Sequence, residues 1–414
     1  MPSLRRPSVA ATAVAAALLV AACERGPVPL ALEPLPSPAA AQAAEPFVAR
    51  ADDGTIWMSW LERQADSSVA LRLSRRAADG TWSTPTDVVR RTDLFVNWAD
   101  FPSVVPVGEG RLLAHWLQRS GNGKFAYDVM LAESADGGAS WSPAVLPHAA
   151  GIPAEHGFVS ILPRGDGGAD VILLDGSAGG LAAASGHEHG APMQLAMATV
   201  RAGSVVESRL LDDRTCDCCQ TAAAMTTQGP VVFYRDRTDG EPEVRDIAVL
   251  RRVNGTWSAP APLHRDGWAI ASCPVNGPQA AALGDTVAVA WFTGARDTAR
   301  VNVAFSTDAG ATFSAPVRAD DGLPTGRVDL ELLDGGTAVL SWIERLGGDT
   351  AQVRTRLVRR DGSVEPALVV SPSSGARSSG FPRMTRDGDG VLVAWTQPGT
   401  PSEVKVARLR AGRR

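Results

Sequence analysis

Apolar strands and polar turns alternate along this chain with a period of 51 to 60 residues. In each unit, a short strand and a small-residue turn precede a second apolar strand centred on an aromatic residue or an aliphatic replacement. Most units continue with a third alternating strand, as at 69–76 and 301–308, and then with a Gly-rich turn and a fourth strand. We call the seven central residues the anchors: Trp60, Trp116, Leu173, Phe233, Trp291, Trp342 and Trp395.

This repeat predicts an all-β fold, a β-propeller of four-stranded blades. A single small sheet cannot bury both of its faces, so such units stack on their neighbours in a ring. Seven blades are favoured, and six would result if two units shared a sheet. The last unit stops after its third strand, at 404–410. A strand within 28–35 could supply the missing fourth strand and close the ring, which removes open sheet edges.

The turns between third and fourth strands carry a second pattern, SADGGASW at 134–141 and STDAGATF at 306–313. In this pattern the Asp can accept backbone N–H bonds, the Gly permits an unusual backbone conformation and the aromatic residue folds back onto the sheet. Weaker copies occur at 77–82 and 252–257. The structural positions are Ser134, Asp136, Gly138, Trp141, Ser306, Asp308, Gly310 and Phe313. These stretches resemble the Asp-box (BNR) repeats of sialidase-like β-propellers, in which they lie away from the catalytic face.

The N-terminal residues are predicted to be a targeting signal. Arg5 and Arg6 precede an apolar run at 9–20 that is too short to span a bilayer. The run ends in Val-Ala-Ala-Cys23 and resembles a bacterial lipoprotein signal, which implies cleavage before Cys23 and its lipidation; the alternative is an ordinary secretory signal. Glu24 favours the outer membrane by the same resemblance. The predicted organisation is a signal peptide at 1–22, a lipidated Pro/Ala-rich tether at 23–44 and the propeller at 45–414.

Charge narrows the choice of partners. Removal of 1–22 takes away two arginines and no acid, so the formal net charge changes from −5 to −7. Nothing in this balance indicates a nucleic-acid partner. The remaining partner classes are the membrane through the lipid anchor, and a glycan, an anionic small molecule or a protein.

Apart from Cys23, all the cysteines lie in two loops. Cys216, Cys218 and Cys219 precede the first strand of the fourth unit, and Cys273 precedes the first strand of the fifth. Corresponding loops of adjacent blades are neighbours, so the four thiols are expected to lie together. In an oxidising periplasm the favoured interpretation is two disulfides. Three cysteines within four residues cannot all reach Cys273, so one bond would be local.

A metal site is the alternative for these thiols. If 216–219 is extended, alternation places Cys216 and Cys218 on one side and Cys219 on the other. Two thiolates and Cys273 could then hold Cu(I) or Zn(II), with His187 or His189 as a further ligand. The cofactor is therefore left open between copper, zinc and none, with none favoured.

Polar residues near the cysteine loops suggest a binding site. Arginines could clamp a carboxylate or phosphate bidentately, or they could stitch strands together through Arg–Asp pairs. The entry loops of other units add an aromatic residue, a histidine and more charges around the same channel. The predicted ligand-binding residues are Trp98, Asp100, His156, Arg235, Arg237, Arg245, Asp246, Asn276, Arg327 and Asp329.

The sialidase resemblance implies an arginine triad, a Tyr activated by Glu, and an Asp acid/base. The nearest stretch to the family's first-strand arginine motif, at 45–50, lacks its order. Tyr127 and Tyr234 are the only tyrosines, and neither lies in the final unit. Glu62 and Glu344 are carboxylates at corresponding strand ends. No catalytic residue is therefore assigned.

The chain as a whole resembles a bacterial lipoprotein branch of sialidase-like propellers, with a CxCC…CPxxGP cysteine cluster. The leading functional hypothesis is an outer-membrane-anchored propeller that binds a ligand or protein partner at its cysteine-rich channel face. The first alternative is a sialidase-like glycoside hydrolase. The second is a periplasmic copper, zinc or redox site.

Overall fold

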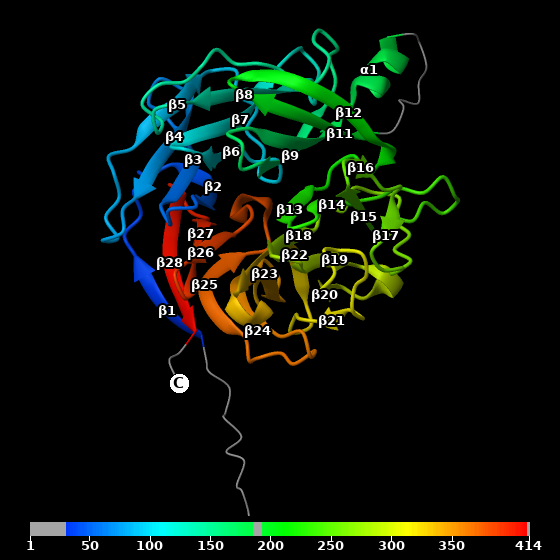
Figure 1. Ribbon diagram of the computed structural model, residues 1–414. Coiled ribbons are helices and arrows are strands. Elements are labelled where there is room, and N and C mark those ends of the chain that lie inside the picture. The colour runs from blue at the N-terminus through cyan, green and yellow to red at the C-terminus, as the bar shows by residue number, and fades with distance from the viewer. Residues whose placement is uncertain (1–29, 185–192, 412–414) are drawn as a thin grey trace, which may run out of the picture.

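The protein is a ring of seven β-sheets around a central channel (Figure 1). The computed structural model describes residues 30–184 and 193–411. Seven blades are present, which confirms the favoured count and excludes the six-bladed alternative. Within the described residues, the only α-helix is α1 (Ser177–Ala184), and none of the described helices is long and apolar enough to cross a membrane.

Each blade begins at the channel and steps outwards in chain order. Blade 1 consists of β2 (Ala43–Arg50), β3 (Ile56–Arg63), β4 (Val69–Arg76) and β5 (Thr86–Arg91), and blade 2 of β6 (Ser103–Gly108), β7 (Arg111–Arg119) and β8 (Tyr127–Ser134). Blade 3 consists of β9 (His156–Pro163), β10 (Ala169–Asp175), β11 (Met193–Arg201) and β12 (Ser204–Thr215). Blade 4 consists of β13 (Ala222–Thr226), β14 (Gly229–Arg235), β15 (Ile247–Val253), β16 (Thr256–Trp257) and β17 (Ala261–Pro262). In blade 2 the fourth strand is reduced to a single bridge between Leu131 and Val145.

Blades 5 to 7 follow the same plan. Blade 5 consists of β18 (Gln279–Leu283), β19 (Thr286–Thr293), β20 (Arg300–Ser306) and β21 (Val317–Arg318). Blade 6 consists of β22 (Pro324–Leu333), β23 (Thr337–Gly347), β24 (Thr350–Val358) and β25 (Leu368–Ser374). Blade 7 consists of β26 (Arg383–Asp387), β27 (Gly390–Gln397) and β28 (Glu403–Ala411), with β1 (Leu30–Leu35) as its outermost strand.

The N-terminal strand closes the ring, as predicted. β1 pairs antiparallel with β28, from Leu30 opposite Ala411 to Leu35 opposite Val406 (Figure 1, blue beside red). Part of the segment predicted as a tether is thus a strand of blade 7. β2 begins at Ala43, two residues before the predicted start of the propeller.

The anchors lie in the second strand of every blade and are buried between neighbouring blades, all at most 6 % exposed. Two of them explain the carboxylates at the strand ends. The indole N–H of Trp60 donates to Glu62 at 3.0 Å, and that of Trp342 donates to Glu344 at 2.6 Å. These bonds satisfy a buried polar group that would otherwise oppose burial of the large ring.

The two clear turns make the same contacts. The Ser134 hydroxyl donates to Asp136 and accepts the N–H of Gly138, both at 2.8 Å. Ser306 repeats this with Asp308 at 2.7 Å and Gly310 at 2.8 Å. Both glycines have positive φ, +84° and +79°, which a residue with a Cβ adopts only at a cost. The turns therefore have the hydrogen bonds that their sequence pattern predicts.

Candidate functional site

The four cysteines lie together, in the loops that enter blades 4 and 5. A disulfide joins Cys218 to Cys273, with a Cα–Cα distance of 6.0 Å, and ties the two blades together. Cys216 and Cys219 are buried thiols whose Sγ atoms lie 3.0 Å apart. The structure therefore has one disulfide between blades rather than two. The metal alternative places Cys216 and Cys218 on one side on the condition that 216–219 is extended. The segment is not extended, because a turn at 217–218 brings Cys216 and Cys219 together.

Charge polarises the buried thiols. Burial raises the pKa of Cys216, but the Cys219 thiol and the guanidiniums of Arg235 and Arg245 outweigh it, so the pKa is lowered. Burial and the neighbouring Cys216 sulfur raise the pKa of Cys219. Nη1 of Arg245 lies 3.5 Å from the Cys216 sulfur. Cys216 is thus the more readily ionised thiol of the pair.

A soft cation could use all three of the sulfurs of Cys216, Cys218 and Cys219 only after the disulfide of Cys218 is broken. The Sγ atoms of Cys216, Cys218 and Cys219 lie within 4.8 Å of one another. Because Cys218 is in a disulfide, two thiols remain as ligands. His187 and His189, the other predicted ligands, lie outside the described residues. The metal alternative therefore stays a prediction.

Arg235 is used for structure rather than left free. Its guanidinium donates to the carbonyl of Asn276 at 2.8 and 3.0 Å, to that of Arg245 at 2.6 Å and to that of Phe292 at 2.7 Å. It also stacks on Trp268, 4.8 Å from the ring centre. These bonds hold the end of β14 against blade 5. They differ from the predicted Arg–Asp pairs in that Arg235 binds backbone carbonyl groups.

The neighbouring charges are also paired. Arg237 binds Asp217 at 3.1 Å and Glu243 at 2.8 Å, and Arg245 binds the other oxygen of Glu243 at 3.2 Å. Asp246 accepts the N–H groups of residues 267 and 268 at 2.9 and 3.0 Å. A ligand at these residues would have to displace an existing partner.

Arg327, Asn276 and Trp98 join the loops of blades 2, 5, 6 and 7 at the channel. Asn276 accepts the N–H of Arg327 at 2.7 Å. The Arg327 guanidinium donates to the carbonyl of Ala376 at 2.9 Å and lies 4.7 Å from the ring centre of Trp98. Burial lowers the pKa of Arg327 to about 10. Trp98 stacks in turn on Phe381.

Asp100 and the two tyrosines are buried. Asp100 accepts the N–H of Phe158 at 2.7 Å and the Tyr127 hydroxyl at 3.2 Å. The Tyr127 hydroxyl lies between two carboxyl groups, since its oxygen is also 2.9 Å from Glu155, and the Tyr234 hydroxyl donates to a carboxylate of β12. Burial raises the pKa of both phenols. Neither tyrosine is exposed or easily ionised, as an attacking group would have to be.

His156 lies apart from the channel pocket described below. Its Nδ1 is 3.2 Å from Asp175, and its ring stacks on His148 at 3.7 Å between centroids. His148 in turn accepts the N–H of Val129 at 3.1 Å. Both rings are therefore held by protein groups.

Asp100 makes stability depend on pH. Burial raises its pKa to about 8, whereas an unfolded aspartate titrates near 3.9. Between these values the unfolded chain releases a proton that the folded protein keeps. The free energy of unfolding should therefore fall as the pH rises from about 4 to about 8.

Asp100→Asn keeps an oxygen for the N–H of Phe158 and does not titrate. We expect it to flatten this fall, in urea unfolding at pH 5 and pH 8. Glu155, with a pKa raised to about 7 by burial, keeps part of the slope. If the free energy of unfolding fell equally between pH 5 and pH 8 in the variant and the wild type, Asp100 would not be a source of the pH dependence.

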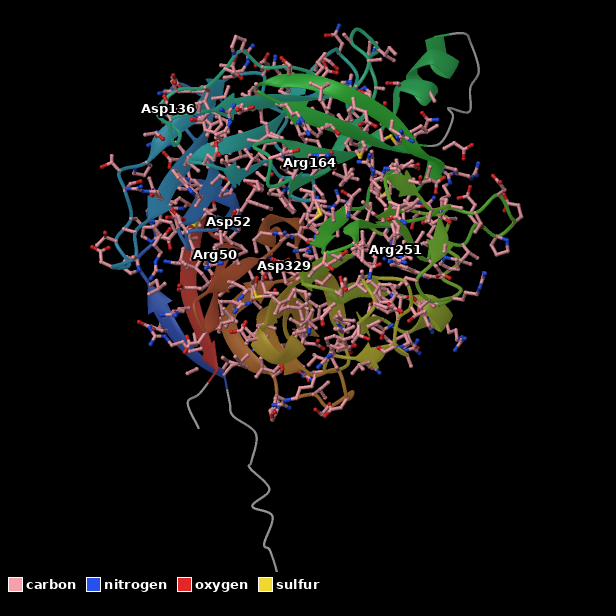
Figure 2. All side chains as sticks on the ribbon, in the orientation of Figure 1. Arg50, Asp52, Asp136, Arg164, Arg251 and Asp329 are labelled. Atoms are coloured by element: carbon pink, nitrogen blue, oxygen red, sulfur yellow. A yellow bond between two sulfur atoms is a disulfide. The ribbon has the colours of Figure 1, made fainter. Side chains whose placement is uncertain are left out.

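The inner strands place one residue of each blade at a common level. In every blade this residue pairs with the residue just before the anchor. We call the set the channel ring: Phe47, Ser103, Ser160, Ala223, Gln279, Asp329 and Arg383. Figure 2 labels Asp329 near the middle of the propeller. Its charged members, Asp329 and Arg383, belong to adjacent blades, and burial raises the pKa of Asp329.

A cavity of about 130 Å³ lies at this level and is lined by the whole channel ring except Asp329. Arg383 is only 9 % exposed, yet its Nε and Nη1 have no hydrogen-bond partner. Its guanidinium lies over the rings of Phe47 and Phe101, at 5.1 and 5.3 Å, and Nη1 is 3.5 Å from Asp329. A buried cation with unused donors is the chemical feature of this cavity.

Sequence reasoning placed Asp329 at the channel but missed Arg383. One signal could have found it. Phe101-Pro102 and Phe381-Pro382 stand directly before the first strands of blades 2 and 7, which aligns Arg383 with Ser103.

No protein-family model matches the chain, and no curated protein matches it. Solved structures similar to the chain include sialidase-like and polysaccharide lyase propellers. The phage phi92 endosialidase has 10 % identity and a TM-score of 0.50, covering 93 % of this chain and 70 % of its own.

An ulvan lyase of family PL25 has 10 % identity and a TM-score of 0.55, covering 90 % of this chain and 95 % of its own. The same kind of lyase bound to -[GlcA(1-4)Rha3S]- has 11 % identity and a TM-score of 0.54, covering 92 % and 95 %. At these identities the likeness defines the fold: the chain is a seven-bladed β-propeller.

Proposed function

We propose that the protein is a binding propeller that holds the acidic group of a small ligand or glycan in its channel, against Arg383. The single observation that carries this proposal is the buried Arg383 guanidinium, whose Nε and Nη1 have no hydrogen-bond partner and whose side chain lines the cavity. A carboxylate can accept two parallel N–H bonds from such a group. The ligand would supply the hydrogen bonds that the protein does not.

The surroundings suit a sugar acid. The aromatic rings of Phe47, Phe101 and Phe158 offer apolar faces, and the polar ring members Ser103 and Gln279 stand beside them. Asp100 also borders the cavity, but burial raises its pKa to about 8, so at neutral pH it is mainly uncharged and does not repel an anion. The cysteine loop adjoins this site through Gln220, which lines the same cavity.

Among the propellers with this fold are an endosialidase and a lyase bound to a saccharide containing GlcA. Those activities belong to those proteins. Here both tyrosines are buried, and Glu62 and Glu344 hold indole N–H groups. These observations favour binding over a sialidase-like hydrolase.

Calorimetric titration with glucuronic acid, N-acetylneuraminic acid and neutral glucose tests the proposal. We expect at least one of the acids to bind and glucose not to bind. Binding of neither acid, or equal binding of glucose, would contradict it. Turnover of a fluorogenic sialoside in the same preparation would instead establish the hydrolase.

We also propose that the mature protein is an outer-membrane lipoprotein anchored through Cys23, on the strength of the lipobox-like sequence alone. We expect Cys23→Ala to leave the membrane fraction while keeping the wild-type unfolding midpoint. Immunoblots of washed membranes measure this. Retention of the variant there would mean that another anchor exists.

A further inference from the structure

The four cysteines differ in access. Cys216 and Cys219, which we call the buried pair, are buried in the loop that enters blade 4. The bond between Cys218 and Cys273 is the surface disulfide, since Cys273 is exposed and Cys218 is partly buried. The Sγ atoms of Cys216 and Cys218 lie 4.0 Å apart, so one sulfur of the buried pair faces one sulfur of the surface disulfide.

The charges favour exchange between them. Thiol–disulfide exchange begins when a thiolate attacks a disulfide sulfur. Arg245, with Nη1 3.5 Å from the Cys216 sulfur, stabilises the thiolate form there. Arg245 is held in place by Glu243, whose carboxylate accepts a hydrogen bond from Nη2 of Arg245 at 3.2 Å.

The two loops do not depend on the disulfide for their position. Gln220 accepts the N–H of Gly277 at 2.8 Å, and Arg235 binds the carbonyl of Asn276. A Cβ on Gly277 would lie 1.9 Å from the Gln220 carbonyl oxygen, so the loops pack tightly beside the cysteines. The disulfide can therefore open while its two cysteines stay close.

We propose that this cluster is a two-electron relay, in which the buried pair exchanges thiols with the surface disulfide and so connects to thiols or disulfides in solution. This function is separate from ligand binding at Arg383. In the first step the Cys216 thiolate bonds to Cys218, and Cys273 leaves as a thiolate.

Cys219 then loses its proton and bonds to Cys216, which releases Cys218 as a thiolate. The sum is two thiols and one disulfide before and after, with the electron pair moved to the surface. The thiols of Cys218 and Cys273 can next reduce a disulfide of a partner molecule to two thiols, with the exposed Cys273 in reach of that partner. The surface disulfide forms again as they do so.

The Cys219→Ser variant tests the first step, because it leaves the attacking Cys216 thiolate without its resolving partner. After native treatment with iodoacetamide, we expect the label on Cys273 and a Cys216–Cys218 bond in unreduced peptide maps. The matched control is Cys216→Ser/Cys219→Ser, which keeps the surface disulfide but has no attacking thiol. It should remain unlabelled.

A label on Cys216, or no label, with the surface disulfide intact would overturn the relay. So would an equimolar copper or zinc ion that protects the wild-type thiols, since this would establish a metal site.

A measurement on the wild type covers the case in which the variant does not fold. Fully oxidised protein receives one equivalent of dithiothreitol, and the thiols are mapped. The relay predicts that they appear in the buried pair, with the surface disulfide formed again. Thiols that stay on Cys218 and Cys273 would contradict it.

Discussion

Replacement of Trp342 by alanine should lower the free energy of unfolding by about 3–5 kcal/mol, the usual cost of removing a core tryptophan. Trp342 is fully buried between blades 5 and 6. The change removes its packing, leaves a cavity and deprives Glu344 of the indole N–H that it accepts. Urea unfolding followed by circular dichroism would measure the loss.

The matched control is Leu323→Ala, a large apolar residue of the same blade that is 61 % exposed. It should change the free energy of unfolding by less than about 0.5 kcal/mol. If both variants unfolded at the wild-type midpoint, the anchors would not be the core of the blades.

Replacement of Arg383 by glutamine should weaken binding of an acidic ligand by about 10- to 100-fold. A hydrogen bond to a charged group contributes about 1.5–3 kcal/mol, and glutamine loses both the charge and the forked geometry. The change should also lower the free energy of unfolding, because Asp329 is buried and loses the nearby positive charge that favours its ionised form. Calorimetric titration of both proteins with the acid that binds the wild type would measure the difference.

Arg386→Gln is the control for this change. Arg386 lies three residues further along β26 and pairs with Asp334, which is exposed. Its replacement removes the same charge from the same strand, outside the residues that line the cavity. Equal losses of affinity in the two variants would show a general effect of charge and would remove Arg383 from the site.

The blades could be predicted because the strands and turns of each repeat are indicated by residues within that repeat. Every anchor marks a second strand, and Gly138 and Gly310 mark turns that need positive φ. The missing last strand required a partner from elsewhere, and β1 was found by elimination. The first strand of blade 1 begins at Ala43, two residues before the propeller start predicted at residue 45. Alanine carries no strong strand signal, so the sequence did not indicate this earlier start.

The site was less predictable because it depends on contacts between blades. Neighbouring loops could be predicted to gather the cysteines, but the turn at 217–218 that pairs Cys216 with Cys219 could not. Arg235 and Arg383 look alike in sequence. Whether a guanidinium donates to carbonyl groups, as in Arg235, or keeps nitrogens without hydrogen-bond partners, as in Arg383, depends on the backbone of other blades.

The pairing of β1 with β28 sets the order in which the protein can be completed. Translation produces Leu30 long before Ala411, yet these residues stand opposite each other. Until the final strand has been made, the outermost strand of blade 7 has nothing to join, and the nascent chain carries an unmatched β-edge at each end of the ring. Such edges invite pairing with other chains, so a chaperone that shields them would be most needed during this interval. Deletion of β1 and deletion of β28 therefore have one effect in common, because each leaves an unpaired strand edge in blade 7.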